Sequence, residues 1–105
     1  MAKPKPLETY YERKFIKKIK DLFPGMIVKK LRDAQGIPDR VFLYGSKWAT
    51  LEFKRTADAV HQPNQDWYVN AMNKMSFARF VFPENKDEVM KDLIAFFADQ
   101  KGQSQ

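Results

Sequence analysis

The stretch from Arg40 to Lys54 reads RVFLYGSKWATLEFK and decides the fold. Its first five residues are an arginine followed by four apolar or aromatic strand-forming side chains, Gly45-Ser46 interrupts that run, and a second patterned run resumes at once. Two such runs joined by a two-residue turn that begins with glycine are typical of a β-hairpin. We therefore predict two adjacent antiparallel strands, at 40–44 and 47–54.

The sequence on either side of the hairpin alternates between helical and strand patterns. The expected elements are a helix at 9–23 ended by Pro24-Gly25, an optional short strand at 26–28, a polar loop at 32–36, the hairpin, a polar connection at 55–63, a helix at 64–75, a buried strand at 78–82, and a last helix opened by Asn85 as N-cap. This order predicts an α/β fold with a small mixed β-sheet flanked by α-helices.

The length and composition of the chain favour a single domain. With 105 residues and 44% hydrophobic side chains, it can build one core. We expect a flexible basic arm at 1–6, one domain at 7–100 and a polar tail at 101–105. No apolar run approaches the roughly 20 residues of a membrane span, and Met1–Pro6 lacks the apolar segment of a secretory signal. The absence of cysteine favours a cytoplasmic setting, in a bacterium or a phage-infected host cell.

The charge balance favours a polyanionic partner. Nineteen Lys and Arg against thirteen Asp and Glu give a net charge of +6 and a pI near 9.6. Nucleic acid is the obvious partner, because each neutralised phosphate releases condensed counterions. The alternative is that this charge only keeps a small domain soluble.

The second strand of the hairpin has one unusual face. Side chains alternate along a strand, so Ala49, Leu51 and Phe53 should enter the core while Glu52 and Lys54 point to the other side. A carboxylate and an ammonium then stand side by side on a strand whose other face is buried. The alternative is an exposed ion pair on a solvated sheet face, which stabilises little.

Asp39 lies just before the first strand of the hairpin. Pro38 stiffens the approach to it, and the 13-residue separation from Glu52 allows the two carboxylates to meet across a tight hairpin. Two converging carboxylates are costly without a cation, and Mg²⁺ suits a site with few carboxylates and open positions for water and phosphate. A lysine beside that ion can steer the attacking water. Asp39 is otherwise an ordinary turn aspartate.

These residues together resemble a known family. Pro38-Asp39 followed by Glu52-Phe53-Lys54 is similar to the signature of the PD-(D/E)XK nuclease superfamily. The longer context, from Gly36 to Arg55 with Gln65 on the next helix, resembles its VRR-NUC branch, found in bacteriophages and DNA-repair enzymes. The resemblance extends over about residues 8–82 and implies a restriction-endonuclease-like core.

The resemblance assigns roles to individual residues. Asp39 and Glu52 would bind the metal together with the backbone carbonyl of Phe53, and Lys54 would position or activate the attacking water. Gln65 would lie beside the active site and hold the lysine or the DNA backbone; its alternative is an ordinary polar residue in the first turn of a helix. The residues that would contact DNA are Arg40, Arg55 and Tyr68.

The resemblance also implies an acidic residue on the first helix. Glu12 fits best, because Ile16 and Ile19 place it on the inward edge of that helix. The alternative is that Glu12 closes a capping box with Thr9. Glu8, one turn earlier, is the second choice for the acidic residue.

The expected activity is therefore hydrolysis of DNA phosphodiester bonds with Mg²⁺, for which Mn²⁺ can substitute. The resemblance implies a homodimer that cuts branched DNA such as a four-way (Holliday) junction. The alternatives are a basic DNA-binding module without catalysis and a restriction-type or RNA-directed nuclease with the same core.

Several aromatic residues and the only histidine have no fixed assignment. Tyr10, Tyr11, Trp48 and Trp67 could stack on exposed bases, and Tyr10, Tyr11 and Trp67 or the Phe96-Phe97 pair could form a dimer interface. Phe96-Phe97 is most simply core. His61 is best explained as a solvated loop residue that could also reach a phosphate.

Overall fold

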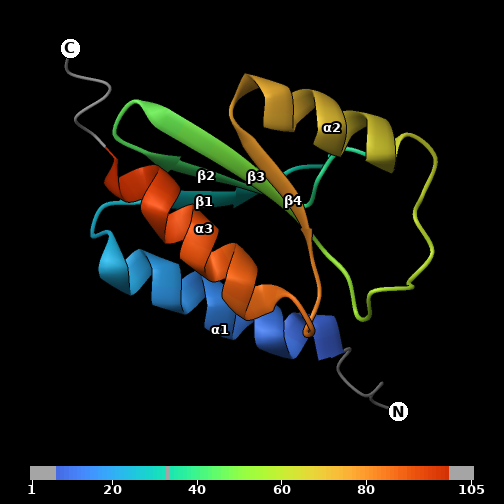
Figure 1. Ribbon diagram of the computed structural model, residues 1–105, viewed down its shortest axis with the longest axis horizontal. Helices are drawn as coiled ribbons and strands as arrows, with labels where there is room; N and C mark the ends of the chain where they lie inside the picture. The colour runs from blue at the N-terminus through green and yellow to red at the C-terminus, as the bar shows by residue number, and fades with distance from the viewer. Residues whose placement is uncertain (1–6, 33, 100–105) are drawn as a thin grey trace.

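The computed structural model describes residues 7–32 and 34–99, with side chains from Tyr10 onward. The predicted arm at 1–6 and the tail at 101–105 lie outside these residues. The elements are α1 (Leu7–Leu22), β1 (Ile27–Lys30), β2 (Arg40–Tyr44), β3 (Lys47–Phe53), α2 (Gln65–Met75), β4 (Phe77–Val81) and α3 (Lys86–Ala98). Figure 1 shows them as a sheet flanked by helices, which confirms the predicted α/β class.

The strands form one mixed sheet in the order β1-β2-β3-β4. β1, β2 and β3 are antiparallel neighbours, and the tight turn between β2 and β3 is the one that the sequence predicts. β4 pairs with β3 in parallel, because α2 carries the chain back along the sheet between them. β3 therefore has a partner on each side and is held from both.

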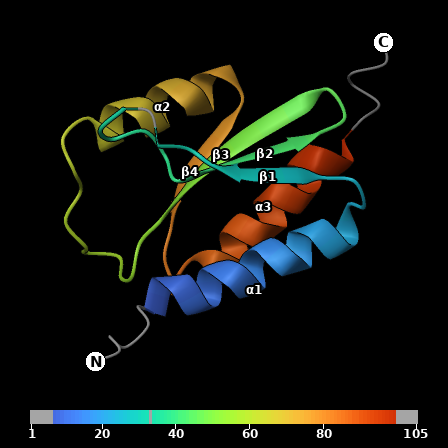
Figure 2. The same ribbon diagram turned by 180° about the vertical axis from the view of Figure 1, so that it is seen from behind.

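The helices cover both faces of the sheet (Figures 1 and 2): α1 and α3 lie on one face and α2 on the other. The main core lies between the sheet and the pair α1 and α3. Its buried apolar side chains are Tyr11, Phe15, Ile19, Met26, Phe42, Ala49, Leu51, Phe53, Phe77, Val81, Val89, Met90, Leu93 and Phe97. Glu52 and Lys54 face α2 instead, as strand alternation predicts.

The first helix begins earlier than predicted. It begins at Leu7, so Thr9 lies inside the helix and the interpretation of Glu12 as the closing residue of a capping box is wrong. The stop at Pro24-Gly25 is confirmed. Gly25 has φ +93°, a left-handed conformation that glycine adopts without steric cost, and the Met26 amide closes the turn on the Phe23 carbonyl.

Two strands are shifted from the prediction by one or two residues. β1 occupies 27–30 instead of 26–28, and β4 occupies 77–81 instead of 78–82. Asn85 does stand at the N-cap position of α3, but its side chain does not cap the helix. It donates to the Phe80 carbonyl and accepts from the Phe82 amide. An amide side chain can do both at once, so Asn85 fixes the turn between β4 and α3.

The structure corrects two suggestions about the aromatic residues. Phe97 is buried in the core, as its simplest interpretation predicts, and so is Tyr11, so Tyr11 cannot stack on a base and neither side chain can form a dimer interface. Tyr10 and Trp67 remain exposed. None of the three described helices combines the length and the apolar composition that crossing a bilayer requires.

Candidate active site

The hairpin brings Asp39 and Glu52 together. Arg40 pairs with Leu51 in the register of β2 and β3, so Asp39 lies directly beside Glu52. The Asp39 amide donates a hydrogen bond of 3.1 Å to Oε1 of Glu52. In return, the Phe53 amide donates one of 3.0 Å to Oδ2 of Asp39. The predicted approach of the two carboxylates is therefore present, and each is fixed by the backbone of the other's strand.

The Glu52 carboxylate lies in an unfavourable environment for a negative charge. Its side chain is only 5% exposed. Burial first, and the charge of Asp39 second, raise its pKa from 4.5 to about 7, against the lowering effects of Lys54 and of hydrogen bonds from Asp39 and Gln65. A cation placed beside the two carboxylates would offset both of these unfavourable effects on the Glu52 charge.

Lys54 is buried next to this carboxylate. Its Nζ lies 3.6 Å from Oε2 of Glu52 and donates to Oε1 of Gln65 at 2.7 Å and to the Val60 carbonyl at 3.1 Å. Both charged side chains of the pair are nearly inaccessible, so the alternative of an exposed ion pair on a solvated face is wrong.

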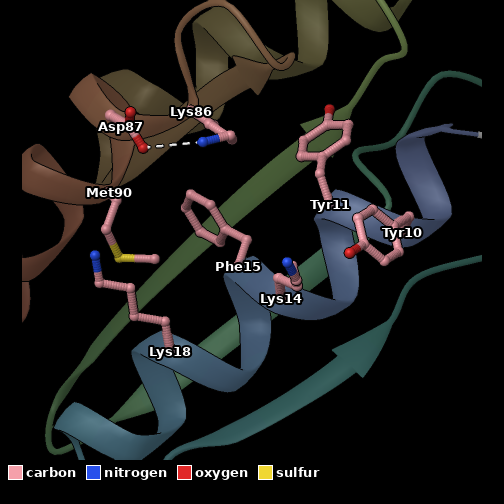
Figure 3. A pocket seen from close by; sticks show the side chains of 8 residues that line it. All are labelled: Tyr10, Tyr11, Lys14, Phe15, Lys18, Lys86, Asp87 and Met90. Carbon is pink, nitrogen blue, oxygen red and sulfur yellow. Dashed lines mark hydrogen bonds and ion pairs between the residues drawn. The ribbon is translucent and has the colours of Figure 1, made fainter.

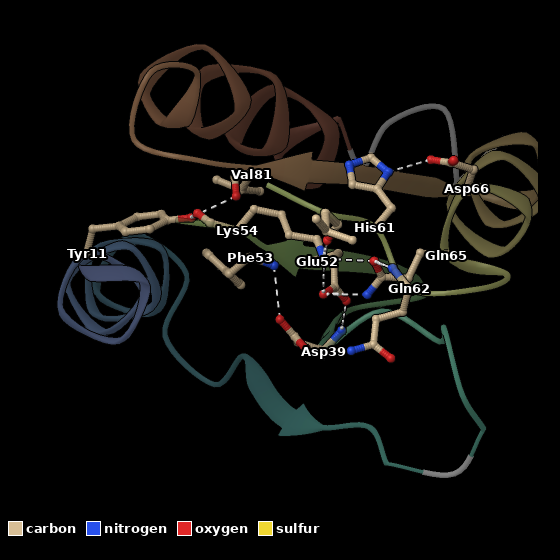
Figure 4. A network of polar contacts seen from close by, with 11 residues as sticks. Tyr11, Asp39, Glu52, Phe53, Lys54, His61, Gln62, Gln65, Asp66 and Val81 are labelled. Atoms are coloured by element: carbon tan, nitrogen blue, oxygen red, sulfur yellow. Dashed lines mark hydrogen bonds and ion pairs between the residues drawn. The ribbon is translucent and has the colours of Figure 1, made fainter. Parts of the chain in front are cut away.

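Gln65 links the two charged residues (Figure 4). Its Nε2 donates to Oε2 of Glu52 at 2.8 Å, while its Oε1 accepts from Lys54 and from the Gln62 amide. One amide side chain thus fixes a carboxylate through its donor and an ammonium through its acceptor. Gln65 is buried, and its placement beside the carboxylate and the lysine matches the predicted position.

Gly36 allows the loop before Asp39 to pack against the start of α2. Its φ is +90°, and a Cβ at this position would lie 2.4 Å from the Pro63 carbonyl oxygen and 2.9 Å from the Gln65 amide nitrogen. Backbone meets backbone at that distance, so no side chain fits. Gly36 therefore sets the spacing between the Asp39 strand and the helix that carries Gln65.

The site opens into a cavity of about 450 Å³. The lining residues are Gly36, Ile37, Asp39, Glu52, Phe53, Lys54, Arg55, Ala59, Val60, Gln62 and Gln65. The ring of Phe53 packs against Tyr11 and Phe15 in the core, so Phe53 reaches the cavity through its backbone. Arg55 is exposed, and as a lining residue it adds a positive charge that is open to solvent.

The donor set suits a hard divalent cation with an incomplete protein shell. Asp39 and Glu52 supply carboxylate oxygens, and the backbone of Phe53 lines the same cavity. Within the described part of the chain, no group of three or more His, Cys, Asp or Glu is placed to hold a metal. Mg²⁺ is compatible with this set, because it binds through one or two carboxylates and keeps water or phosphate in its other positions.

Glu12, the acidic residue of the first helix that the resemblance implies, pairs with Arg40. Its Oε2 accepts a 2.6 Å hydrogen bond from Nε of Arg40, and both side chains are largely buried. Glu12 is not among the residues that line the cavity. The ion pair also occupies Arg40, the predicted DNA contact. The side chain of Glu8, the second choice, lies outside the described residues.

Two residues, His61 and Tyr11, make contacts that the sequence does not predict. The His61 ring stacks on Phe80 with centroids 4.2 Å apart, and its Nδ1 lies 2.8 Å from Oδ1 of Asp66. His61 is an exposed loop residue, as predicted, and these two contacts anchor it. The Tyr11 hydroxyl donates to the carbonyls of Lys54 and Val81. The spacing of Tyr11, Phe15 and Ile19, four residues apart, is the signal that places Tyr11 inward.

Tyr68, the third predicted DNA contact, lies on α2. Tyr68 is half-buried and packs edge-to-face against the exposed Trp67 on α2.

Comparison of the chain with protein-family models, with curated proteins and with solved structures gave no match.

Proposed function

We propose that this protein is a Mg²⁺-dependent DNA endonuclease of the PD-(D/E)XK type, with Asp39, Glu52 and Lys54 at its active site. The observation that carries the proposal is the buried arrangement of Glu52, Lys54 and Gln65 beside Asp39 at an open cavity. If the Glu52–Lys54 ion pair served only to stabilise the fold, a second carboxylate beside it would be a disadvantage, because the charge of Asp39 raises the pKa of Glu52.

The residues of the chain divide the work of phosphodiester hydrolysis. Asp39 and Glu52 would hold the cation through their carboxylate oxygens, which the backbone amides of Phe53 and Asp39 orient by hydrogen bonds. The bound ion would supply charge stabilisation for the phosphate and lower the pKa of a water. Lys54 would present its ammonium to that water and to the scissile phosphate from within the cavity.

Gln65 serves as a positioning residue in this proposal. Two of its hydrogen bonds restrict the Glu52 carboxylate and the Lys54 ammonium to one relative placement. Donors and charges that are already fixed in place need not reorient when the reaction occurs. This preorganisation is the main source of electrostatic catalysis.

The net charge of +6 supports a nucleic acid as substrate. By the resemblance described above, the substrate class is branched DNA and the active form is a homodimer. The exposed Arg55 at the cavity is available for a phosphate of the substrate.

A substrate panel tests the proposal. Supercoiled, linear and four-way-junction DNA and a structured RNA would be incubated with the protein in Mg²⁺, in Mn²⁺ and in excess chelator. The proposal expects cleavage of DNA with either metal and none with chelator. Metal-independent DNA binding without cleavage of any substrate would favour the non-catalytic module, and cleavage of RNA alone would replace DNA as the substrate.

A further inference from the structure

A second groove lies between α1 and α3, outside the candidate active site. Figure 3 shows Phe15 at its centre, with Tyr11 on one side and Met90 on the other. These three side chains are at most 7% exposed and form an apolar floor. The groove has a volume of about 300 Å³, at the lower end of the range for ligand pockets, roughly 300–1,000 Å³.

The rim of this groove is cationic. Lys14 and Lys18 stand on the α1 side, and Lys86 stands on the α3 side (Figure 3). Asp87 is the one acidic residue among those that line it, and it pairs with Lys86 at 3.1 Å. Lys14 and Lys18 are exposed, so two ammonium groups remain accessible on the α1 side.

Tyr10 adds an aromatic surface beside these lysines. It is 55% exposed, and its ring lies 4.8 Å from Nζ of Lys14. An exposed ring next to ammonium groups is the combination with which proteins bind unpaired nucleotides, because bases stack on the ring while phosphates approach the cations.

The groove adjoins the candidate active site through Tyr11. The Tyr11 side chain lines the groove, while its hydroxyl donates to the carbonyl of Lys54, a cavity residue, and to that of Val81 at the end of β4. The N-terminal ends of α1 and α3 also lie at the same end of the molecule as the 55–64 connection (Figures 1 and 2). A chain of nucleotides could therefore pass from one site to the other around the ends of β3 and β4.

We propose that the groove between α1 and α3 binds an unpaired strand of the substrate next to the cut, with Tyr10 stacking on a base and Lys14 and Lys18 contacting phosphates. This inference rests on the proposed function, because it takes a nucleic acid as the substrate of the neighbouring cavity. It adds a preference for DNA that has a single-stranded segment beside the duplex.

Binding measured in chelator tests the groove without cleavage. The probe is a short fluorescein-labelled oligodeoxynucleotide, used as a single strand and as a blunt duplex, with affinity read by fluorescence anisotropy over a range of salt. The double variant Lys14→Gln/Lys18→Gln should bind the single strand about tenfold more weakly. Its salt dependence should be shallower by about 1.4 in the logarithmic slope, since each lost phosphate contact on a single strand removes about 0.7.

The matched control removes the same charge elsewhere on the helices. Lys74 and Lys91 are exposed on α2 and α3 and do not line the groove. The variant Lys74→Gln/Lys91→Gln should keep most of the affinity. Equal losses in the two double variants would mean that only diffuse charge attracts DNA, and this result would overturn the proposal.

The tyrosine gives a second, charge-neutral test. Tyr10→Ala should weaken binding of the single strand about tenfold, whereas Tyr10→Phe, which keeps the ring, should bind like the wild type. Unchanged affinity of Tyr10→Ala for the single strand would show that Tyr10 does not stack on a base, and this would contradict the proposed mode of binding in the groove. Thermal unfolding of each variant confirms that it is folded.

These results separate the two proposals. Selective loss of binding in the groove variants, in a protein that cuts no DNA, would support the groove and refute the nuclease. Cleavage by the wild type, with groove variants that bind and cut as well as the wild type, would support the nuclease and refute the groove.

Discussion

Asp39 and Glu52 exchange hydrogen bonds across the β2–β3 hairpin: the Asp39 amide binds the Glu52 carboxylate, and the amide that follows Glu52 binds the Asp39 carboxylate. Each acid is thereby oriented by the strand of the other. The two negative charges cannot move apart without breaking these bonds. The burial of Glu52 first, and the fixed charge of Asp39 second, raise the pKa of Glu52, and this leads to the first prediction.

Glu52→Gln should stabilise the metal-free protein at pH 8 and have little effect near pH 4.5. The pKa of Glu52 is about 7 in the folded state against 4.5 for an ordinary glutamate, so the folded state binds more protons between these values. The free energy of unfolding of the wild type therefore falls as pH rises through this window, by on the order of 3 kcal/mol. Glu52→Gln should not lose this stability as pH rises, because its amide is uncharged like the protonated acid.

Thermal unfolding in chelator at both pH values measures the effect. Addition of Mg²⁺ at pH 8 should stabilise the wild type more than the variant, since only the wild type keeps both carboxylates. A variant that is less stable than the wild type at pH 8 and equal to it at pH 4.5 would show that the charged carboxylate stabilises the fold instead.

Lys54→Ala should abolish DNA cleavage and retain metal binding. The substitution removes the ammonium from the cavity but leaves the Asp39 and Glu52 oxygens in place. Calorimetric titration with Mn²⁺ measures binding, and cleavage is assayed with the same preparation. Lys74→Ala, on the surface of α2, is the control. Cleavage at the wild-type rate in Lys54→Ala would remove this lysine from the mechanism.

Gly36→Ala should destabilise the protein more than Gly25→Ala does. Both glycines have a φ near +90°, so both substitutions carry the conformational cost, about 1 kcal/mol or more. Only at Gly36 does the new Cβ meet backbone, at 2.4 Å from the Pro63 carbonyl, whereas nothing lies within 4 Å at Gly25. Denaturant unfolding compares the two. Equal losses of stability in the two variants would mean that the loop around Gly36 can move away from α2 without a cost in free energy.

The hairpin and its acids could be predicted from the sequence because their geometry is local. A two-residue turn and strict alternation fix which side chains of β3 face away from the core, and Asp39 then has only one neighbour across the turn. The sequence therefore places Glu52, Lys54 and Asp39 correctly without knowledge of the rest of the fold.

The contacts that the sequence does not reveal are between distant segments. The Arg40–Glu12 ion pair depends on how α1 crosses the sheet, and the stacking of His61 on Phe80 depends on the path of the 55–64 connection. Neither path has a local sequence signal. The role of Asn85 differs from the predicted helix cap for another reason. An asparagine at an N-cap position can also bond to the preceding turn, and here the Phe80 carbonyl and the Phe82 amide at the end of β4 take up its side chain.

The proposed homodimer should have a mass of about twice 12.4 kDa by light scattering at micromolar concentration. Tyr11 and Phe97 are buried, so the interface must use exposed apolar side chains such as Trp67, which is 65% exposed on α2. Trp67→Arg should therefore give a monomer, while Leu22→Arg, at the exposed end of α1, should not. A wild-type monomer that still makes paired cuts in a junction would contradict the two-fold arrangement.

The most direct test compares cleavage of one labelled DNA by the wild type, Asp39→Asn and Glu52→Gln, purified identically and assayed in Mg²⁺. Each substitution removes a negative charge and a metal ligand with little change of shape, so binding measured in chelator should be equal or tighter. A trace of contaminating nuclease would be unaffected by these changes. The proposed function predicts cleavage by the wild type and none by either variant; undiminished cleavage by either variant would contradict it.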